Sequence, residues 1–526
     1  MIKIIGGGLA GSEAAWQAAS QDVPVALYEM RPVRPTAVHK TDRLAELVCS
    51  NSFRGDKLDN AVGLLKEEMR RLGSLVMQAA EASRVPAGAA LAVDRERFAD
   101  AITRALSDHR LITIVREEVT AIPASSEREP VIVATGPLTS DALSADLRSL
   151  VGQEHLYFYD AISPIVLADT IDRSKVFRAS RWDRSLGPVR PKPDATDRRF
   201  QADGTDDRGV RPPPSLEAPA ADEDGSACGV DDRQGDYLNC PLTREEYDRF
   251  YEALVHAESA TVHDFDHERF FEGCLPIEVM AHRGGDTLRF GPMKPVGLVD
   301  PRTGRQPYAA VQLRQDNLAG DHYSLVGFQT QLKWGEQARV LRLIPGLEGA
   351  EFVRFGMVHR NTYVNGPTVL TETWQVRGRP ALLFAGQMSG VEGYVESAAS
   401  GLLAGLNAAA LAKGEPTAAP PRTTAIGALA YYVSHADPAH YEPSNITFGI
   451  MQPLDRAPRN KLARKLGLAE RALVDLARWM DGRALADAER RSHAGEAPAA
   501  LASAEARARA SDSLELKSAG GGAPAP

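Results

Sequence analysis

Two short stretches near the N-terminus contain residues whose types and spacing could carry out chemistry. "IKIIGGGLAGSEAAWQAA" places glycines in a GxGxxG pattern between an apolar run and a helical one. Further along, "ELVCSNSFRG" contains Cys49, one of only four cysteines in the chain. The glycine pattern is typical of a dinucleotide site, and a thiol becomes a nucleophile when it is deprotonated.

The glycine loop has the features that a pyrophosphate needs. Glycines permit a tight turn and a close approach of the backbone, and the helix that follows presents N–H groups and a positive dipole end. Glu29 ends the next predicted strand, "VPVALYEM", where a carboxylate suits a ribose hydroxyl. This context favours a dinucleotide site over a purely structural turn, and its predicted residues are Gly6, Gly7, Gly8, Leu9, Ala10, Gly11 and Glu29.

Three features favour FAD over NAD as the dinucleotide. "VIVATGP" resembles the strand and turn that close the nucleotide domain of many flavoproteins, and it contains Gly136. "FAGQMSGVEGYVESAASG" resembles the later turn and helix that reach the flavin ring, and it contains Gly386 and Gly393. A long insertion between the two halves is also usual in that class. The alternative for the later string is a glycine-tolerant start of a buried helix.

Cysteine usage and composition limit the class of protein. Cys49, Cys228, Cys240 and Cys274 form no CxxC pair, which argues for a reducing cytoplasm and against a disulfide framework or a zinc site. Taken singly, Cys49, Cys240 and Cys274 are each typical of a small buried apolar residue, whereas Cys228 lies in the proline-rich segment and is interpreted as incidental. No spacing shows that Cys49 and Cys274 meet. With 43% hydrophobic residues and no apolar run of about 20, we expect a soluble protein without a membrane span or secretory signal.

The 526 residues exceed what one small core requires, so two or three domains are expected. Strand, helix and strand patterns alternate at the start, which predicts an α/β fold: a Rossmann-type FAD-binding domain with a smaller inserted α/β domain. Helices are predicted over 61–83 and 94–109. The expected boundaries are 1–170 and 365–445 for the FAD-binding domain, 181–235 for a proline-rich disordered insertion, 236–364 for an inserted domain facing substrate and RNA, 446–490 for a C-terminal helical segment, and 491–526 for a disordered tail.

The inserted domain combines basic and aromatic residues. The net charge of −9 argues weakly against bulk binding of nucleic acid, but residues 281–370 carry an excess of cations, and 455–483 do as well. A basic surface with stacking rings suits RNA, whereas the alternative is an ordinary solvated face. The cations of 281–370 are Arg283, Arg289, Lys294, Arg302, Arg305, Arg314, Lys333, Arg339, Arg342, Arg354 and Arg360, and the rings are Tyr308, Tyr323, Phe328, Trp334, Phe352, Phe355 and Tyr363.

Long strings in the right order resemble the bacterial folate/FAD-dependent tRNA (uracil-5-)-methyltransferase family. The resemblance runs from residue 1 to about 440 and breaks at 181–235 and in the C-terminal tail. The strings are "IIGGGLAGSEAAWQ", "LVCSNSFRGD", "YLNCPLTREEY", "FEGCLPIEVMAHRG", "GPMKPVGL", "LVGFQTQLKWGEQ", "FVRFGMVHRNTYVN" and "FAGQMSGVEGYVESAASGLLAG".

The resemblance implies a substrate, cofactors and roles. The family methylates the T-loop uridine at tRNA position 54 with a one-carbon unit from 5,10-methylenetetrahydrofolate, using FAD that NAD(P)H reduces. Its two functional cysteines fall on Cys49 and Cys274, as nucleophile and as partner or general base, and which cysteine has which role stays open. Arg54 and Arg283 are near them in sequence and could lower a thiol pKa.

Alternatives from other classes remain. A related flavoprotein could modify the tRNA wobble uridine or a ribosomal RNA uridine, and an RNA-binding flavoprotein could lack methyl transfer. A plain NAD(P)H:disulfide oxidoreductase would need a CxxxxC or CxxC pair beside the flavin, and the sequence has none. The oligomeric state is not indicated.

Overall fold

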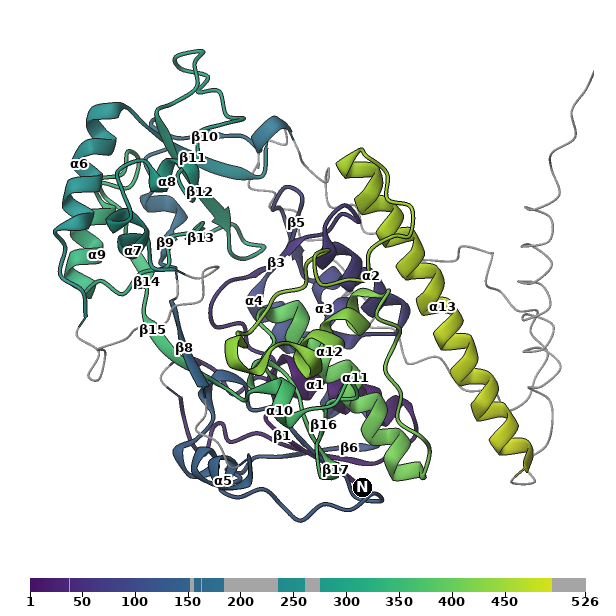
Figure 1. Ribbon diagram of the computed structural model, residues 1–526. Helices are drawn as coiled ribbons and strands as arrows, with labels where there is room; N and C mark the ends of the chain where they lie inside the picture. The colour runs from purple at the N-terminus through teal and green to yellow at the C-terminus, as the bar shows by residue number, and fades with distance from the viewer. Residues whose placement is uncertain (37, 152–155, 162, 184–234, 261–274, 494–526) are drawn as a thin grey trace, which may run out of the picture.

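The structure is a computed structural model that describes residues 1–36, 38–151, 156–161, 163–183, 235–260 and 275–493 (Figure 1). Nearly all of the predicted insertion (181–235) and tail (491–526) lies outside the described residues, as do Cys228 and Cys274. Two bodies are visible in Figure 1, one around strands β1 and β17 and one around β11 and β12.

A six-stranded sheet forms the centre of the first body. Its order is β16-β17-β7-β1-β2-β6, and all neighbours are parallel except β16 and β17. A parallel sheet has helices on both faces, which explains the continuous apolar runs of its strands. The Rossmann-type α/β fold is therefore confirmed. The strands are β1 (Ile2–Ile5), β2 (Val25–Tyr28), β6 (Ile112–Val115), β7 (Val131–Val133), β16 (Gln375–Val376) and β17 (Arg379–Phe384).

Helices from both ends of the chain surround this sheet. The helix predicted over 61–83 is two helices, because Gly73 adopts a positive φ of 73° between them. The helices of this body are α1 (Leu9–Ser20), α2 (Ala61–Arg71), α3 (Leu75–Ala82), α4 (Arg95–Ser107), α5 (Asp141–Val151), α10 (Gly366–Val369), α11 (Tyr394–Lys413), α12 (Ala425–His435) and α13 (Lys461–His493). A small antiparallel sheet of β3 (Ser52–Gly55), β5 (Ala90–Val93) and β4 (Arg84–Val85) lies beside them.

The second body is built on a six-stranded antiparallel sheet of order β10-β11-β12-β13-β9-β14. Strand β9 belongs to it, so the boundary predicted at residue 170 falls after a strand of the second sheet. Its elements are β9 (Ile165–Leu167), β10 (Phe177–Arg178), β11 (Tyr237–Leu242), α6 (Arg244–Val255), α7 (Ile277–His282), α8 (Thr287–Phe290), β12 (Ala309–Gln315), β13 (His322–Leu325), α9 (Trp334–Leu341) and β14 (Phe352–Arg354). A two-stranded ribbon of β8 (Leu156–Ala161) and β15 (Val358–Tyr363) connects the two bodies (Figure 1).

Helices α1 and α11 lie unusually close together. A Cβ at Gly401 would lie 2.1 Å from the carbonyl oxygen of Ala10, and one at Gly405 would lie 2.5 Å from that of Ala14. Among the described residues, α11 is the one helix long and apolar enough, by length and composition, to span a membrane, but 83% of that stretch is buried inside the protein. It is thus a core helix that joins the two halves of the first body.

Adding one methyl group at this crossing should destabilise the protein. We expect Gly401→Ala to lower the free energy of unfolding by about 2 kcal/mol, because a backbone oxygen must move away. The control is Gly335→Ala on α9, where an added Cβ meets no atom within 4 Å and where alanine is the better helix former by up to about 1 kcal/mol. Urea unfolding followed by circular dichroism measures both, and equal midpoints would contradict the interpretation of the crossing.

Candidate active site

A cavity of about 430 Å³ opens at the carboxyl ends of β1, β2 and β7. This is where ligands bind in open α/β sheets. The structure brings nearly all of the predicted site residues to its wall, although they come from distant parts of the chain. They are Gly6, Gly7, Gly8, Leu9, Ala10, Glu29, Cys49, Gly136, Gly386 and Gly393, whereas Gly11 does not line the cavity.

Gly6, Gly8 and Gly11 of the loop have different steric surroundings. Gly6 has a φ of 106°, and a Cβ there would lie 2.5 Å from the carbonyl oxygen of Ala134. A Cβ at Gly11 would lie 1.8 Å from the carbonyl oxygen of Gly6, so Gly11 lets α1 begin against the loop. A Cβ at Gly8 would meet nothing within 4 Å. Gly8 therefore faces the open cavity.

The start of α1 is suited to an anion. Gly8 is the N-cap of the helix, and no side chain caps its first turn. The first amides of a helix have no acceptor within the helix and carry the positive end of its dipole. A phosphate in the cavity would meet these amides, so the loop and helix fit the pyrophosphate of a dinucleotide.

Glu29 is buried at the end of β2 and is held by four hydrogen bonds. Its Oε1 accepts from the Nε (2.9 Å) and the amide (3.0 Å) of Arg31, and its Oε2 accepts from the Nη2 of Arg31 (3.2 Å) and the amide of Gly7 (3.1 Å). Burial alone would raise the pKa of Glu29, but the hydrogen bonds and charge of Arg31 lower it below its usual value. Glu29 is thus an ionised acceptor that also fixes the glycine loop.

The later glycines form the opposite wall. Gly386, Gly390 and Gly393 have φ angles of 75°, 87° and 105°, which L side chains rarely adopt. The turn they form ends at Tyr394, the first residue of α11. The hydroxyl of Tyr394 accepts hydrogen bonds from the amides of Cys49 (2.7 Å) and Ser50 (3.2 Å). The glycine-rich turn therefore positions the backbone of the cysteine loop.

Three arginines contact the loop of residues 47–51, which contains Cys49. Arg95 begins α4 in the first body, whereas Arg314 and Arg354 lie on β12 and β14 of the second sheet. The loop thus lies where the two bodies meet. The donated bonds are Arg95 Nη1 to the Leu47 oxygen (2.8 Å), Arg314 Nη2 to Ser50 Oγ (2.8 Å), Arg314 Nε to Asn51 Oδ1 (2.8 Å), and Arg354 Nη2 to the Val48 oxygen.

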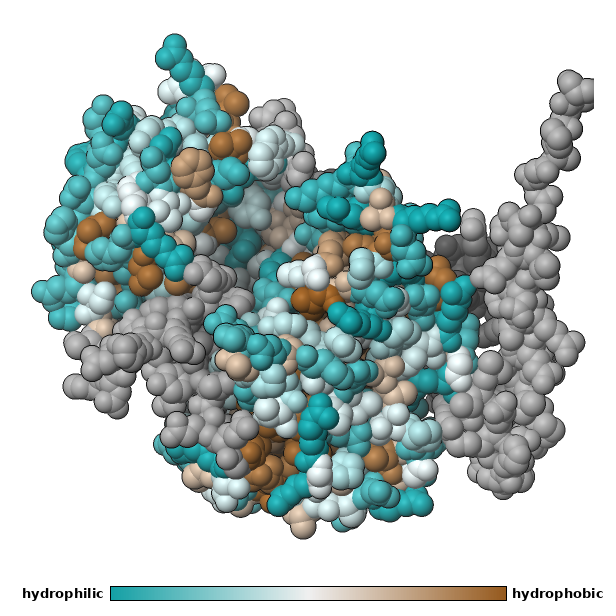
Figure 2. All heavy atoms as spheres, viewed as in Figure 1, coloured by the Kyte–Doolittle hydropathy of each residue, from teal (hydrophilic) through white to brown (hydrophobic). Residues whose placement is uncertain are grey.

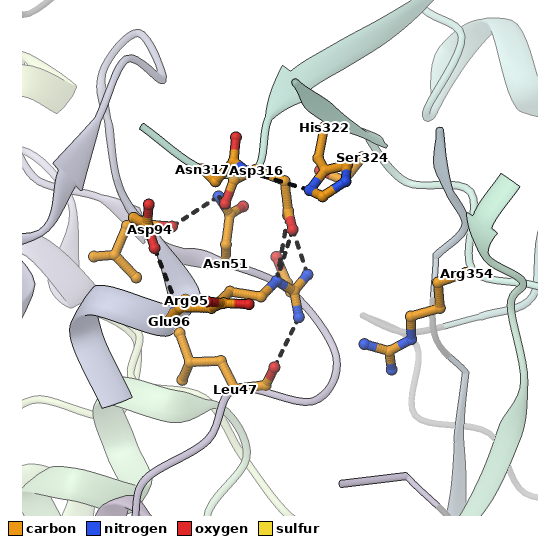
Figure 3. Close-up of polar contacts among 12 residues, drawn as sticks. Leu47, Asn51, Asp94, Arg95, Glu96, Asp316, Asn317, His322, Ser324 and Arg354 are labelled. Atoms are coloured by element: carbon orange, nitrogen blue, oxygen red, sulfur yellow. Dashed lines mark hydrogen bonds and ion pairs between the residues drawn. The ribbon is translucent and has the colours of Figure 1, made fainter. Parts of the chain in front are cut away.

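Further polar contacts hold the two bodies together beside this loop (Figure 3). Arg95 forms an ion pair of 3.0 Å with Asp316, which follows β12. Asn51 donates to the carbonyl oxygen of Gln315 (3.1 Å), and the amide of Leu318 donates to Asp94 (2.9 Å). In Figure 3, Arg354 points toward the same region from the opposite side.

Proximity in sequence pointed to Arg54, whereas the arginines that contact the loop containing Cys49 are Arg95, Arg314 and Arg354. Arg54 lines the cavity but is hydrogen-bonded to Glu396 and to Asn445 (2.6 Å). The charge of Cys49 instead acts on Arg95, Arg314 and Arg354. Arg314 is only 9% exposed, so it is neither part of a basic outer surface nor on a solvated face. No local sequence signal marked Arg95 or Tyr394.

Of Cys240 and Cys274, the structure describes only Cys240. Cys274 lies outside the described residues. Cys240 lies on β11 in the core of the second sheet, where burial raises the pKa of its thiol. It therefore has the properties of a small apolar core residue.

Aromatic residues of the second body are partly on its surface. Trp334 is 62% exposed and stacks on Phe355 with ring centroids 5.9 Å apart, and Phe355 stacks on Phe352 at 5.1 Å. The guanidinium of Arg289 lies 3.7 Å from the centroid of the Tyr308 ring. Figure 2 shows that the visible face of both bodies is mostly hydrophilic, with hydrophobic residues in small separate groups.

Comparisons with known proteins agree with this architecture. The family model described as GIDA, "Glucose inhibited division protein A", matches residues 1–192 and 222–416. Two crystal forms of Aquifex aeolicus GidA superpose with TM-scores of 0.60 at 18% and 19% identity, covering 90% of this chain and 72% and 75% of theirs. At that identity the likeness concerns the fold alone.

Curated relatives are much more similar in sequence. Proteins named "Methylenetetrahydrofolate--tRNA-(uracil-5-)-methyltransferase TrmFO" match from Desulforudis audaxviator (56% identity, 91% of this chain, 98% of the relative), Heliobacterium modesticaldum (53%, 91%, 98%) and Moorella thermoacetica (54%, 90%, 96%). The chain therefore belongs to the methylenetetrahydrofolate--tRNA-(uracil-5-)-methyltransferase TrmFO family.

Proposed function

We propose that this protein methylates carbon 5 of a uridine in tRNA, with 5,10-methylenetetrahydrofolate as the carbon donor and FAD as the cofactor. One observation carries the proposal: Cys49 and the glycine loop Gly6–Gly11 belong to one site, with Cys49 and most of the loop on the wall of the same cavity. The names of the curated relatives describe this reaction. The alternative, another RNA uridine, is not favoured by those names.

The residues that line the cavity are of the kinds that FAD requires. The uncapped start of α1 suits the pyrophosphate, Glu29 suits a ribose hydroxyl, and the Gly136 turn and the Gly386–Gly393 turn close the other side. When bound, reduced FAD supplies the hydride that converts a transferred methylene group to methyl, and NAD(P)H is the external reductant. The residues around the cavity hold the cofactor and place a thiol beside it.

Carbon 5 of uracil is a poor nucleophile, so the enzyme must activate the ring. A thiolate that adds to carbon 6 leaves an enolate, whose carbon 5 can attack an electrophilic methylene carbon. A base must then remove the proton from carbon 5 before the thiol leaves. We assign the addition to Cys49, because it lines the cavity, and the second thiol role to Cys274.

More specifically, we propose that the methylated residue is the T-loop uridine at position 54 of tRNA. We propose that the T-arm binds against the second body, where the exposed ring of Trp334, stacked on Phe355, offers a platform for an unpaired base. Stacking on aromatic rings is how proteins hold single-stranded RNA.

A substitution at Gly8 should separate FAD binding from folding. The side chain of Gly8→Val would project into the cavity at the start of α1, so we expect FAD content to fall at least about tenfold, while circular dichroism shows that the fold is retained. The matched control is Gly349→Val, where an added Cβ also meets nothing within 4 Å. Flavin absorbance per mole of purified protein measures the content, and a fully FAD-loaded Gly8→Val protein would remove the proposed pyrophosphate position.

The reaction can be tested with an unmodified tRNA transcript, methylenetetrahydrofolate and NAD(P)H. We expect 5-methyluridine at the T-loop position by mass spectrometry, and its loss in Cys49→Ala and in Cys274→Ala, because each removes a required thiol. Cys240→Ala should retain activity, since that thiol is buried in the second core. FAD-loaded protein that leaves tRNA unmodified but methylates ribosomal RNA would refute the proposed substrate.

A further inference from the structure

In the part of the chain that the structure describes, three guanidinium groups donate hydrogen bonds to the loop of residues 47–51. Arg95 is compensated by its ion pair with Asp316. Among the described residues, neither Arg314 nor Arg354 forms an ion pair with a carboxylate, and both donate only to neutral groups of the loop. Both guanidinium groups lie at the contact between the two bodies, where Arg314 is buried and Arg354 is half-buried.

Such cations are costly to bury without an anion. Burial lowers the pKa of Arg314 and of Arg354, and for Arg354 the nearby Arg95 lowers it further, whereas the charge of Cys49 acts in the opposite direction on both. Among the described residues beside the loop, the carboxylate of Asp94 accepts from the amides of Glu96, Arg97 and Leu318 rather than from Arg314 or Arg354. Burial raises the pKa of the Tyr394 phenol, so it stays neutral, and Arg54 is paired with Glu396.

From this arrangement we infer that Arg314 and Arg354 are positioning residues that hold Cys49 as a thiolate, so that the second body supplies the charges that make a thiol of the first body reactive. The inference rests on the proposed function for its purpose, because that reaction needs a thiolate. Arg354 bonds the backbone of the loop at Val48, and Arg314 bonds the side chains of Ser50 and Asn51, so charge and position are set together. The charge around the loop and the position of the loop both require that the second sheet contacts Asn51 and Arg95.

The experiment measures the acidity of Cys49 in the full-length, FAD-loaded protein without tRNA or folate. The protein is alkylated with iodoacetamide between pH 5 and 10, and the rate at Cys49 is read from its peptide by mass spectrometry. Because only the thiolate reacts, the pH of half-maximal rate is the thiol pKa. We expect a value below about 7.5 for the unaltered protein, against about 8.5 for an ordinary cysteine.

Removing either cation should raise that pKa. We expect Arg314→Met and Arg354→Met each to shift the profile upward by about one unit, which slows alkylation at pH 6 about tenfold. Arg354→Lys retains the charge, so we expect it to keep the pKa of Cys49 close to the value in the unaltered protein. The matched control is Arg342→Met, since Arg342 also donates to a backbone carbonyl, that of Ala350 at 3.1 Å, but lies on the exposed end of α9 and should leave the profile unchanged.

Flavin content and circular dichroism identify any variant that fails to fold. If Arg314→Met fails, the comparison of Arg354→Met with Arg354→Lys tests the inference. Identical profiles for Arg354→Met and Arg342→Met would overturn the inference, as would an ordinary pKa in the unaltered protein. A low Cys49 pKa in a protein that methylates no tRNA would leave the inference standing and refute the proposed function instead.

Discussion

The close contact between α1 and α11 is the constraint on which the site depends. Glycines at 401 and 405 let α11 pack against backbone oxygens of α1, so the two halves of the nucleotide-binding body meet although nearly 400 residues separate them. The crossing sets the start of α11 opposite the start of α1. One wall of the cavity is therefore the glycine loop, and the other is the turn that leads to Tyr394.

Tyr394 extends this constraint to the cysteine. Its hydroxyl accepts from two consecutive amides of the loop that contains Cys49, so the thiol is placed relative to both glycine-rich turns. The second body approaches the same loop from the other side through β12 and β14. The proposed dinucleotide site and the thiol thus share one cavity, because contacts from Tyr394 and from the second sheet meet at the loop of residues 47–51.

The same contacts explain how the second sheet contributes to the proposed chemistry of Cys49. The sheet has its own apolar core, which includes Cys240, and it also contributes the buried cation Arg314 to the contact with the first body. Buried charges are expensive to maintain for stability alone. Arg314 and Arg354 are thus better explained by the loop they contact than by the contact area between the bodies.

The sequence by itself determined the glycine loop, the α/β class, the family and the two candidate cysteines, because these depend on local patterns or on long similar strings. The structure then brought Gly6, Gly8, Glu29, Gly136 and Gly393 to one cavity, since the carboxyl ends of parallel strands meet at one edge. The sequence did not divide the 61–83 helix at Gly73, because glycine is also tolerated inside helices. Only the tertiary structure decided which charges surround Cys49: guanidinium groups about 50 and 300 residues away come together through docking of two sheets, and no periodicity along the chain records that contact.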